Sequence, residues 1–529
     1  MTAQSRALGI SEILDLIFGY VPHEPQFAIS PPRPQGEYSV HRDDGFVRRH
    51  YVEPPLTSTF ALFEDPPVSV VLPTNAGRST LLAAALSCRR FTSSALAILW
   101  RTMDSLGPLL SLLPIVDHCG QHILASNIAP ETWARFDLYR NLVRVLTLSR
   151  GSQHIIGGKW YLDAVWTIVI VLKPVPLPCL HTLIIPVFDN TVPLKSFSPF
   201  LTSPHLQHLQ VGKVADRGPF IAFCSLIQHV GQRRLQSIAI GSDLLVKNLN
   251  LIITPELRSL RVRLVIKTTP SHMLSNLPSL RHLHLWIAGE VDSGRVLLPS
   301  LESLHLSGTR ESVSGFLSSC VCDLQALFIT LPPDWNLPDR PGDTPKLLLQ
   351  IVANKWPYSL RHFEIDCTTH RRPSNDLWGN FMETIQPIMD LPLLTLRFLN
   401  SLFKLGSDVP IITLASHFRQ IQSIFLPPSE GLTFSELYKL AVDSPQLQHL
   451  GVSVNLQGDQ PQPSINHGLK TLHVLKSRLV GPPENIALGL DRIFPTLTKI
   501  ESLLSESKGD KWHEVERFLG LYHRARDRL

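Results

Sequence analysis

Histidine and cysteine are the side chains whose spacing in this sequence could support chemistry. His282 and His284 lie in the string PSLRHLHL, and Cys320 and Cys322 form a C-x-C motif. Residues two apart on a strand share one face, so the two imidazoles could in principle hold a metal ion. Neither motif has a second pair or a third ligand at suitable spacing, and we therefore expect no metal site and no bound cofactor.

The remaining cysteines give no sign of a disulfide framework. The chain has seven cysteines, an odd number, spread without regular spacing. Such usage is typical of reduced, mostly buried thiols in a reducing compartment. We expect an intracellular protein of the cytoplasm, the nucleus or both.

Motifs of known catalytic sites do not occur in the sequence. It contains no G-x-S-x-G, no P-loop, no H-E-x-x-H and no G-x-G-x-x-G after a strand. We therefore expect no catalytic residues and no enzyme activity. A hydrolase or another enzyme built on a repeat scaffold is the alternative.

Length and composition favour a repeat array. The chain has 529 residues, of which 44% are hydrophobic and 18% charged, and its net charge is only +5. One hydrophobic core rarely serves so long a chain, whereas stacked repeats can. No apolar stretch is long enough to span a bilayer, and no dense basic tract occurs. We expect neither membrane nor nucleic acid as a partner.

An apolar triad recurs from about residue 140 onward. Leucine, isoleucine or valine occupies offsets 0, 3 and 5 in PHLQHLQV, PELRSLRV, PSLRHLHL, PSLESLHL and further copies, with a period of about 21–23 residues in the central run. The end of each triad alternates with period two, which predicts a strand with one buried face. A single unit cannot offset its ordering entropy, so the units must stack.

The predicted fold is therefore α/β: a leucine-rich-repeat solenoid, with parallel strands on its concave face and helices on its convex face, behind a small all-α module. Convex helices are expected from Pro219, Thr344 and Thr433, the last with a Thr433–Glu436 capping box. The expected segments are a helical module at 1–21 and 76–106, a Pro-rich flexible insert at 22–75, a helical linker or cap at 107–139, the solenoid at 140–505 and a capping helix at 506–529.

The helical module resembles an F-box. The strings ISEILDLIFGYV (10–21), STLLAAALSCRRF (79–91) and TSSALAILWRTMDSL (92–106) resemble its three helices. The residues L-S-C-R-R-F (86–91) and L-W-R (99–101) stand where the family has L-x-x-C-R-x-F and L-W-R. The form is similar to F-box proteins of mushroom-forming fungi, which also carry degenerate leucine-rich repeats. Two departures are the absence of the usual Leu-Pro before Glu12 and the insert at 22–75.

This resemblance implies docking on the adaptor Skp1, through it on a cullin–RING ubiquitin ligase, and capture of a substrate protein by the repeats. The alternatives are that the apolar faces pack only within the module, or that the chain is a leucine-rich-repeat protein-binding scaffold without ubiquitin-ligase association. The adaptor-binding candidates are Ile10, Ile13, Leu14, Ile17, Phe18, Leu82, Leu86, Phe91, Leu99 and Trp100.

Offsets 2, 4 and 6 of each repeat should face outward on the concave sheet. Histidine is frequent there, which suggests a strip that recognises a weakly acidic substrate segment with pH sensitivity near 6.5. The alternative is that imidazole is simply tolerated on a half-exposed strand. The substrate-binding candidates are His208, Arg261, Arg263, His282, His284, Trp286, His305, His362 and Glu364.

Overall fold

The structure is a computed structural model of the whole chain, and its contacts divide it into two compact units, residues 1–263 (unit 1) and 264–529 (unit 2). Each unit is described by itself. The residues that the structure describes are 23–25, 71–73, 75–118, 121–125, 128–148, 163–188, 194–214, 217–231, 234–245, 250–265, 271–287, 289, 294–331, 344–367, 381–399, 411–418, 420–426, 431–456, 465–475, 477, 479, 481–502 and 511–526.

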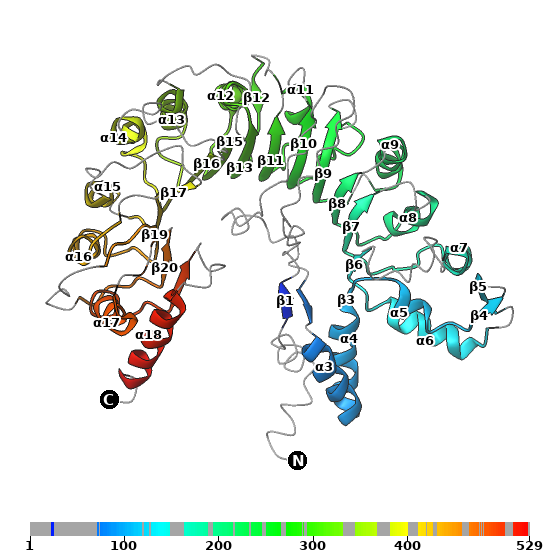
Figure 1. The fold of residues 1–529 in the computed structure, drawn as a ribbon. Coiled ribbons are helices and arrows are strands. Elements are labelled where there is room, and N and C mark those ends of the chain that lie inside the picture. Colours follow the sequence, from blue (N-terminus) through cyan, green and yellow to red (C-terminus); the bar gives the residue numbers. More distant parts are fainter. Residues whose placement is uncertain are drawn as a thin grey trace, which may run out of the picture. The chain divides into compact units, whose positions relative to one another are not determined.

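Within these residues, fifteen strands belong to one sheet, and neighbouring strands of known register run parallel (Figure 1). The strands that begin in unit 1 are β3 (Thr102–Met103), β6 (Val145–Thr147), β7 (Thr182–Phe188), β8 (His208–Val214), β9 (Ser237–Leu245) and β10 (Ser259–Val265). The strands of unit 2 are β11 (His282–Ile287), β13 (Ser303–Gly308), β15 (Ala326–Leu331), β16 (His362–Cys367), β17 (Thr395–Leu399), β18 (Ser423–Phe425), β19 (His449–Val452), β20 (Thr471–Val474) and β21 (Lys499–Ser502).

A ladder of buried apolar side chains confirms the predicted triads. Leu283 of β11 pairs with Leu304 of β13, which pairs with Leu327 of β15, and all three are fully buried. The same row continues to Ile500 of β21. Each buried aliphatic side chain contributes about 1.5–3 kcal/mol, and the ladder shares that gain between neighbouring repeats. The parallel sheet and its ladder confirm the leucine-rich-repeat fold.

The helices of unit 2 follow one side of its strands (Figure 1). The capping box predicted for the helix after Thr433 is present: the Thr433 N–H donates to Oε2 of Glu436 at 2.8 Å, and the Glu436 N–H donates to Oγ1 of Thr433 at 3.3 Å. The helices are α11 (Ser271–Leu274), α12 (Arg310–Ser319), α13 (Thr344–Lys355), α14 (Phe381–Ile385), α15 (Ile411–His417), α16 (Phe434–Asp443), α17 (Pro483–Ile493) and α18 (Trp512–Arg526).

Unit 1 begins with a helical hairpin whose turn differs from the expected one. Helix α3 (Asn75–Ser87) ends before Cys88, and α4 (Arg89–Arg101) begins after it, so the predicted break between Phe91 and Thr92 is wrong. Cys88 has extended backbone angles, and the Thr92 hydroxyl donates to the carbonyl oxygen of Ala85 at 2.8 Å. Phe91 therefore lies in the second helix, packed on the cluster of Leu81, Ala85 and Ala95.

The segment after the hairpin is also more varied than expected. The segment 107–139, expected as a helical linker or N-terminal cap, contains an antiparallel hairpin between its helices. Ile115 pairs with Leu124 and Val116 with Ile123, so the apolar residues of the two strands lie opposite each other. The segment contains α5 (Gly107–Leu110), β4 (Ile115–His118), β5 (Gln121–Leu124) and α6 (Pro130–Arg140), and unit 1 continues with α7 (Asp163–Leu172), α8 (Leu194–Leu201) and α9 (Arg217–Leu226).

Two short strands lie at the ends of the Pro-rich segment. Strand β1 (His23–Pro25) pairs antiparallel with β2 (Val71–Pro73). No pattern predicted these strands, since both segments are only three residues long and end in proline.

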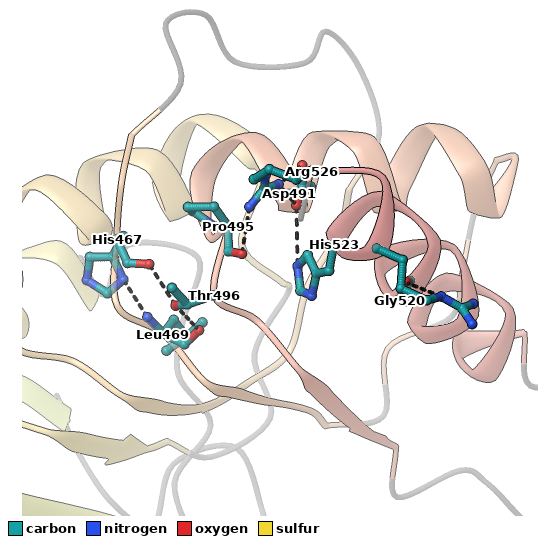
Figure 2. A network of polar contacts seen from close by, with 9 residues as sticks. His467, Leu469, Asp491, Pro495, Thr496, Gly520, His523 and Arg526 are labelled. Carbon is teal, nitrogen blue, oxygen red and sulfur yellow. Dashed lines mark hydrogen bonds and ion pairs between the residues drawn. The ribbon is translucent and has the colours of Figure 1, made fainter. Parts of the chain in front are cut away.

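Helix α18 packs against α17 at the end of unit 2, and Figure 2 shows the polar contacts around it. Asp491 of α17 accepts from the guanidinium of Arg526 and lies 3.4 Å from Nε2 of His523. The indole N–H of Trp512 donates to the carbonyl oxygen of Ser477 at 3.1 Å. These contacts attach α18 to the last repeat and keep its apolar face from water. None of the described helices is long and apolar enough to cross a membrane.

Candidate functional site

The face of the unit 2 sheet opposite its helices, here called the open face, brings outward side chains into register. One line of paired residues crosses nine strands, because parallel pairing sets equivalent offsets side by side. This central row consists of His284, His305, Phe328, Glu364, Arg397, Phe425, Gly451, His473 and Glu501.

The first part of the central row is an imidazole stack. The rings of His284 and His305 are nearly parallel, with centroids 3.9 Å apart. Nε2 of His305 lies 3.0 Å from Oγ1 of Thr330, a hydrogen bond whose direction depends on the tautomer. The ring of Phe328 follows at 6.1 Å from His305. This part of the row is dominated by ring packing rather than by charge.

An ion pair and a cation–π contact occupy the middle of the row. Arg397 lies 3.9 Å from Glu364, and its guanidinium lies over the ring of Phe425 at 4.0 Å. Glu364 is only 3% exposed. Burial lowers the pKa of Arg397, while Glu364 and Glu501 oppose that shift.

Gly451 makes room for the next contact. A Cβ at this position would lie 2.2 Å from Cδ1 of Phe425, so only glycine lets that ring lean across β19. The ring thereby reaches His473 on β20, at 4.5 Å between centroids. Nδ1 of His473 lies 2.8 Å from Oε2 of Glu501, and the ammonium of Lys499 pairs with Oε1 of the same carboxylate.

A second row runs beside the first and contains His282, Ser303, Ala326, His362, Thr395, Ser423, His449, Thr471 and Lys499. Nδ1 of His362 lies 3.0 Å from Oγ1 of Thr395. The second row therefore offers mainly neutral hydrogen-bonding groups, with Lys499 at its end.

The prediction of pH sensitivity near 6.5 does not hold for His362, His449 and His473, the histidines of this face whose pKa values are shifted. Burial lowers the pKa of His362 to about 4, with Arg361 adding to the shift. Burial likewise lowers the pKa of His473 to about 4, against the attraction of Glu501. The pKa of His449 is lowered by burial and by Arg397. These imidazoles are neutral at pH 7, because desolvation disfavours their charged form.

The structure brings together some of the predicted substrate-binding residues and separates others. His284, His305 and Glu364 share the central row, His282 and His362 the second row, and all of these except His362 are buried. Trp286 lies in a third row with Asp366, and is half-buried. The remaining candidates, Arg261 and Arg263 on β10 and His208 on β8, belong to unit 1.

Several residues of the central row were not among the sequence candidates, although the same offsets would have found them. Phe328 occupies offset 4 of its repeat, as do Arg397 and Phe425 in weaker copies. Glu501 holds the same place in the last copy. The search for histidine passed over them, and the role of Gly451 needed the ring position of Phe425.

The hairpin of unit 1 presents some of the predicted adaptor-binding residues to solvent. Leu82 and Leu86 of α3 are 49% and 79% exposed. Phe91 and Leu99 pack within the hairpin cluster, and Trp100 lies against the ring of Tyr139 at 4.4 Å. The other candidates lie outside the described residues: Ile10, Ile13, Leu14, Ile17 and Phe18.

Among the described residues, no group of three or more histidine, cysteine, aspartate or glutamate side chains could hold a metal ion. The two faces just described differ in chemistry: the hairpin presents aliphatic side chains, and the open face of unit 2 presents rings, hydroxyls and paired charges.

No family model and no curated protein sequence matches the chain. Among solved structures, the Rad7 and Elc1 complex in yeast is 12% identical, with 72% of this chain and 78% of that chain covered and a TM-score of 0.31. The ectodomain of the receptor kinase GASSHO1/SCHENGEN3 from Arabidopsis thaliana is 11% identical, with coverages of 71% and 48% and a TM-score of 0.19. The register and the ladder of this chain define a leucine-rich-repeat fold.

Proposed function

We propose that the chain is an F-box-type substrate receptor. In this proposal the helical module docks on Skp1, and through it on a cullin–RING ubiquitin ligase, while the repeats hold a target protein. The role is one of binding, with no catalysis by the chain itself. The F-box-like motifs and the repeat fold motivate the proposal together.

The observation that carries it is the exposure of α3. Leu82 and Leu86 are spaced i, i+4, so they lie on one side of the helix, and both remain largely exposed after the hairpin has packed. Leu81 and Ala85 on the other side are buried against α4. In the proposal this aliphatic pair, beside a core that has already formed, is the surface that the adaptor covers.

Binding of purified Skp1 to the full chain tests this proposal. Leu86→Asp should weaken binding by about tenfold or more, since a charge would be desolvated in an apolar interface. Folding should be unaffected, because Leu86 is 79% exposed. Val171→Asp is the matched control, since Val171 is 73% exposed on α7, and it should bind Skp1 as the wild type does.

The target is proposed to bind the open face of unit 2 where its side chains remain accessible. Lys499 is exposed, and Glu501 and His449 are half-buried, whereas His284, His305 and Glu364 are covered. The strands β19–β21 therefore combine accessible charge with neutral hydrogen-bonding groups.

A scaffold that binds proteins without a ubiquitin ligase is the second candidate. The packing of Phe91 and Leu99 inside the hairpin favours it, because these side chains already have intramolecular partners. Under this alternative, Skp1 would fail to bind the wild-type chain, and Leu86→Asp would leave every recovered partner unchanged.

A further inference from the structure

The C-x-C motif lies at a corner of unit 2, away from the open face. Helix α12 ends at Ser319, and β14 (Cys320–Val321) pairs in parallel with β12 (Val296–Leu297). The side chain of Val321 is 47% exposed, and alternation along the strand turns both cysteines to the other side. Their sulfur atoms lie 3.5 Å apart, in contact but not bonded.

Two consecutive residues at the end of α13 hold the backbone of the motif. The ammonium of Lys355 donates to the carbonyl oxygens of Ser318 at 2.7 Å and of Cys320 at 2.6 Å. The indole N–H of Trp356 donates to the carbonyl oxygen of Cys322 at 2.9 Å. Both cysteines are thereby fixed in position with a cation beside them, so the contact between the two thiols is built into the fold.

The two thiols have unequal environments. Cys320 is only 1% exposed, whereas Cys322 is half-buried. The hydrogen bond with Cys320 lowers the pKa of Cys322, against the opposing effect of burial, while Trp356 and Lys355 lower it further and Asp323 opposes them. That hydrogen bond and burial raise the pKa of Cys320. Thiolate is the reactive form, and Cys322 is also the more accessible of the two residues. Both observations favour Cys322 as the nucleophile and Cys320 as the resolving thiol.

We propose that Cys320 and Cys322 form a peroxide-sensitive dithiol that closes reversibly to an intrachain disulfide. The Cys322 thiolate attacks one oxygen of hydrogen peroxide, the O–O bond breaks, and Cys322 becomes a sulfenic acid while hydroxide takes a proton to form water. Cys320 sulfur then attacks Cys322 sulfur, the S–OH bond breaks, and the Cys320 proton leaves with that hydroxide as a second water. The two thiols lose two electrons, and the peroxide gains them.

Closure requires little movement. A disulfide bond is about 2.05 Å long, so the sulfur atoms must approach by roughly 1.5 Å. Cys322 lies just beyond β14, where the chain leaves the strand for β15, so it can supply this shift without breaking the β12–β14 pairing. A ring closed over one intervening residue is strained, and strained disulfides are easily reduced. Thiols such as glutathione should therefore restore the pair.

Peptide mapping of the full chain tests the proposal. Trypsin releases both cysteines in one peptide, residues 311–346, which contains no other cysteine. After limited hydrogen peroxide, alkylation and digestion without reductant, this peptide should be unalkylated and lighter by two hydrogen atoms than its fully reduced form. Reduced glutathione should reverse the change. Cys224 should stay a thiol, because burial raises its pKa to about 12.

Variants assign the two roles. In Cys320→Ala, oxidation should stop at a sulfenic acid on Cys322, trapped by dimedone. In Cys322→Ala, Cys320 should react at least roughly tenfold more slowly than Cys322 does in the wild type. The proposal is overturned if the wild-type peptide keeps two alkylatable thiols under peroxide that oxidises Cys88, or if Cys320 is the residue that dimedone labels. Neither result depends on Skp1 binding.

Discussion

The open faces of the two units share one scaffold and differ in chemistry. From β3 to β9 of unit 1 the paired outward rows contain small or uncharged side chains: Thr102, Val145, Thr182, His208 and Ser237 in one, Thr147, Ile184, Gln210 and Ala239 in the other. Two arginines, Arg261 and Arg263, follow on β10. In unit 2 the corresponding rows contain stacked rings, an ion pair and a cation–π contact.

The inward ladder is the same in both units, as Leu209 of β8 and Leu304 of β13 illustrate. The fold therefore depends on the inward positions, which both units conserve in kind. The outward positions are free to vary, and the ring stack, the ion pair and the cation–π contact described on this face lie in unit 2. This concentration of ring contacts and paired charge is why the target is proposed to bind the open face of unit 2.

The largest expected effect tests what the two units share. Leu209→Ala and Leu304→Ala should each lower the free energy of unfolding by about 2–5 kcal/mol, because both side chains are buried and leave a cavity. Urea unfolding followed by circular dichroism measures the loss. If one of the two substitutions lowered the free energy of unfolding by less than about 1 kcal/mol, the buried ladder of that unit would not be a main source of its stability.

Two glycines sharpen the comparison. Gly451→Ala should cost about 1–3 kcal/mol, because the new Cβ meets the ring of Phe425. In unit 1, Gly212→Ala should cost at least as much, since its Cβ would meet the backbone oxygen of Pro186. Adding Phe425→Ala should reduce the loss of stability caused by Gly451→Ala and leave that of Gly212→Ala unchanged. A double-mutant cycle on the free energies of unfolding measures both. Independent, additive costs would contradict the ring contact.

The charged pair of unit 2 has no counterpart among the paired rows described for unit 1. Arg397→Met should cost about 1–2 kcal/mol, since it removes the cation beside the buried Glu364 and over the Phe425 ring. Gln210→Met on the open face of unit 1 is the control and should change stability by less than about 0.5 kcal/mol. Thermal unfolding of the two variants measures both changes in stability. If the two changes were equal, the charged contacts of unit 2 would not distinguish its face from that of unit 1.

The smallest expected effect is a pH dependence. The folded pKa values of His362 and His473, about 4, lie below the unfolded value of 6.5, so unfolding takes up protons between these pH values. Stability should therefore fall as pH drops from 6.5 to about 4, by roughly 1 kcal/mol for each residue after solvent screening.

The double variant His362→Gln, His473→Gln should flatten this part of the stability curve, measured by urea unfolding at several pH values. An unchanged slope would mean that neither imidazole is held neutral by the fold.

Periodicity was sufficient to predict the repeat fold, because Leu283, Leu304 and Leu327 recur at offsets that only stacked strands can bury. Local rules also predicted the cap at Thr433. The turn at Cys88 was missed because nothing in L-S-C-R-R-F marks a helix break. The burial of Glu364 and the lowered pKa of His473 depend on neighbours from other repeats, which no local pattern contains.

Co-purification of the tagged full chain from cells, with quantitative mass spectrometry, tests most directly whether one chain joins an adaptor to a target. Leu86→Asp should lose Skp1 and cullin while retaining the target. The double variant His449→Ala, Lys499→Ala should lose the target while retaining Skp1. Recovery of a partner without Skp1 by the wild-type chain, or simultaneous loss of adaptor and target in both variants, would contradict a receptor with two separate binding surfaces.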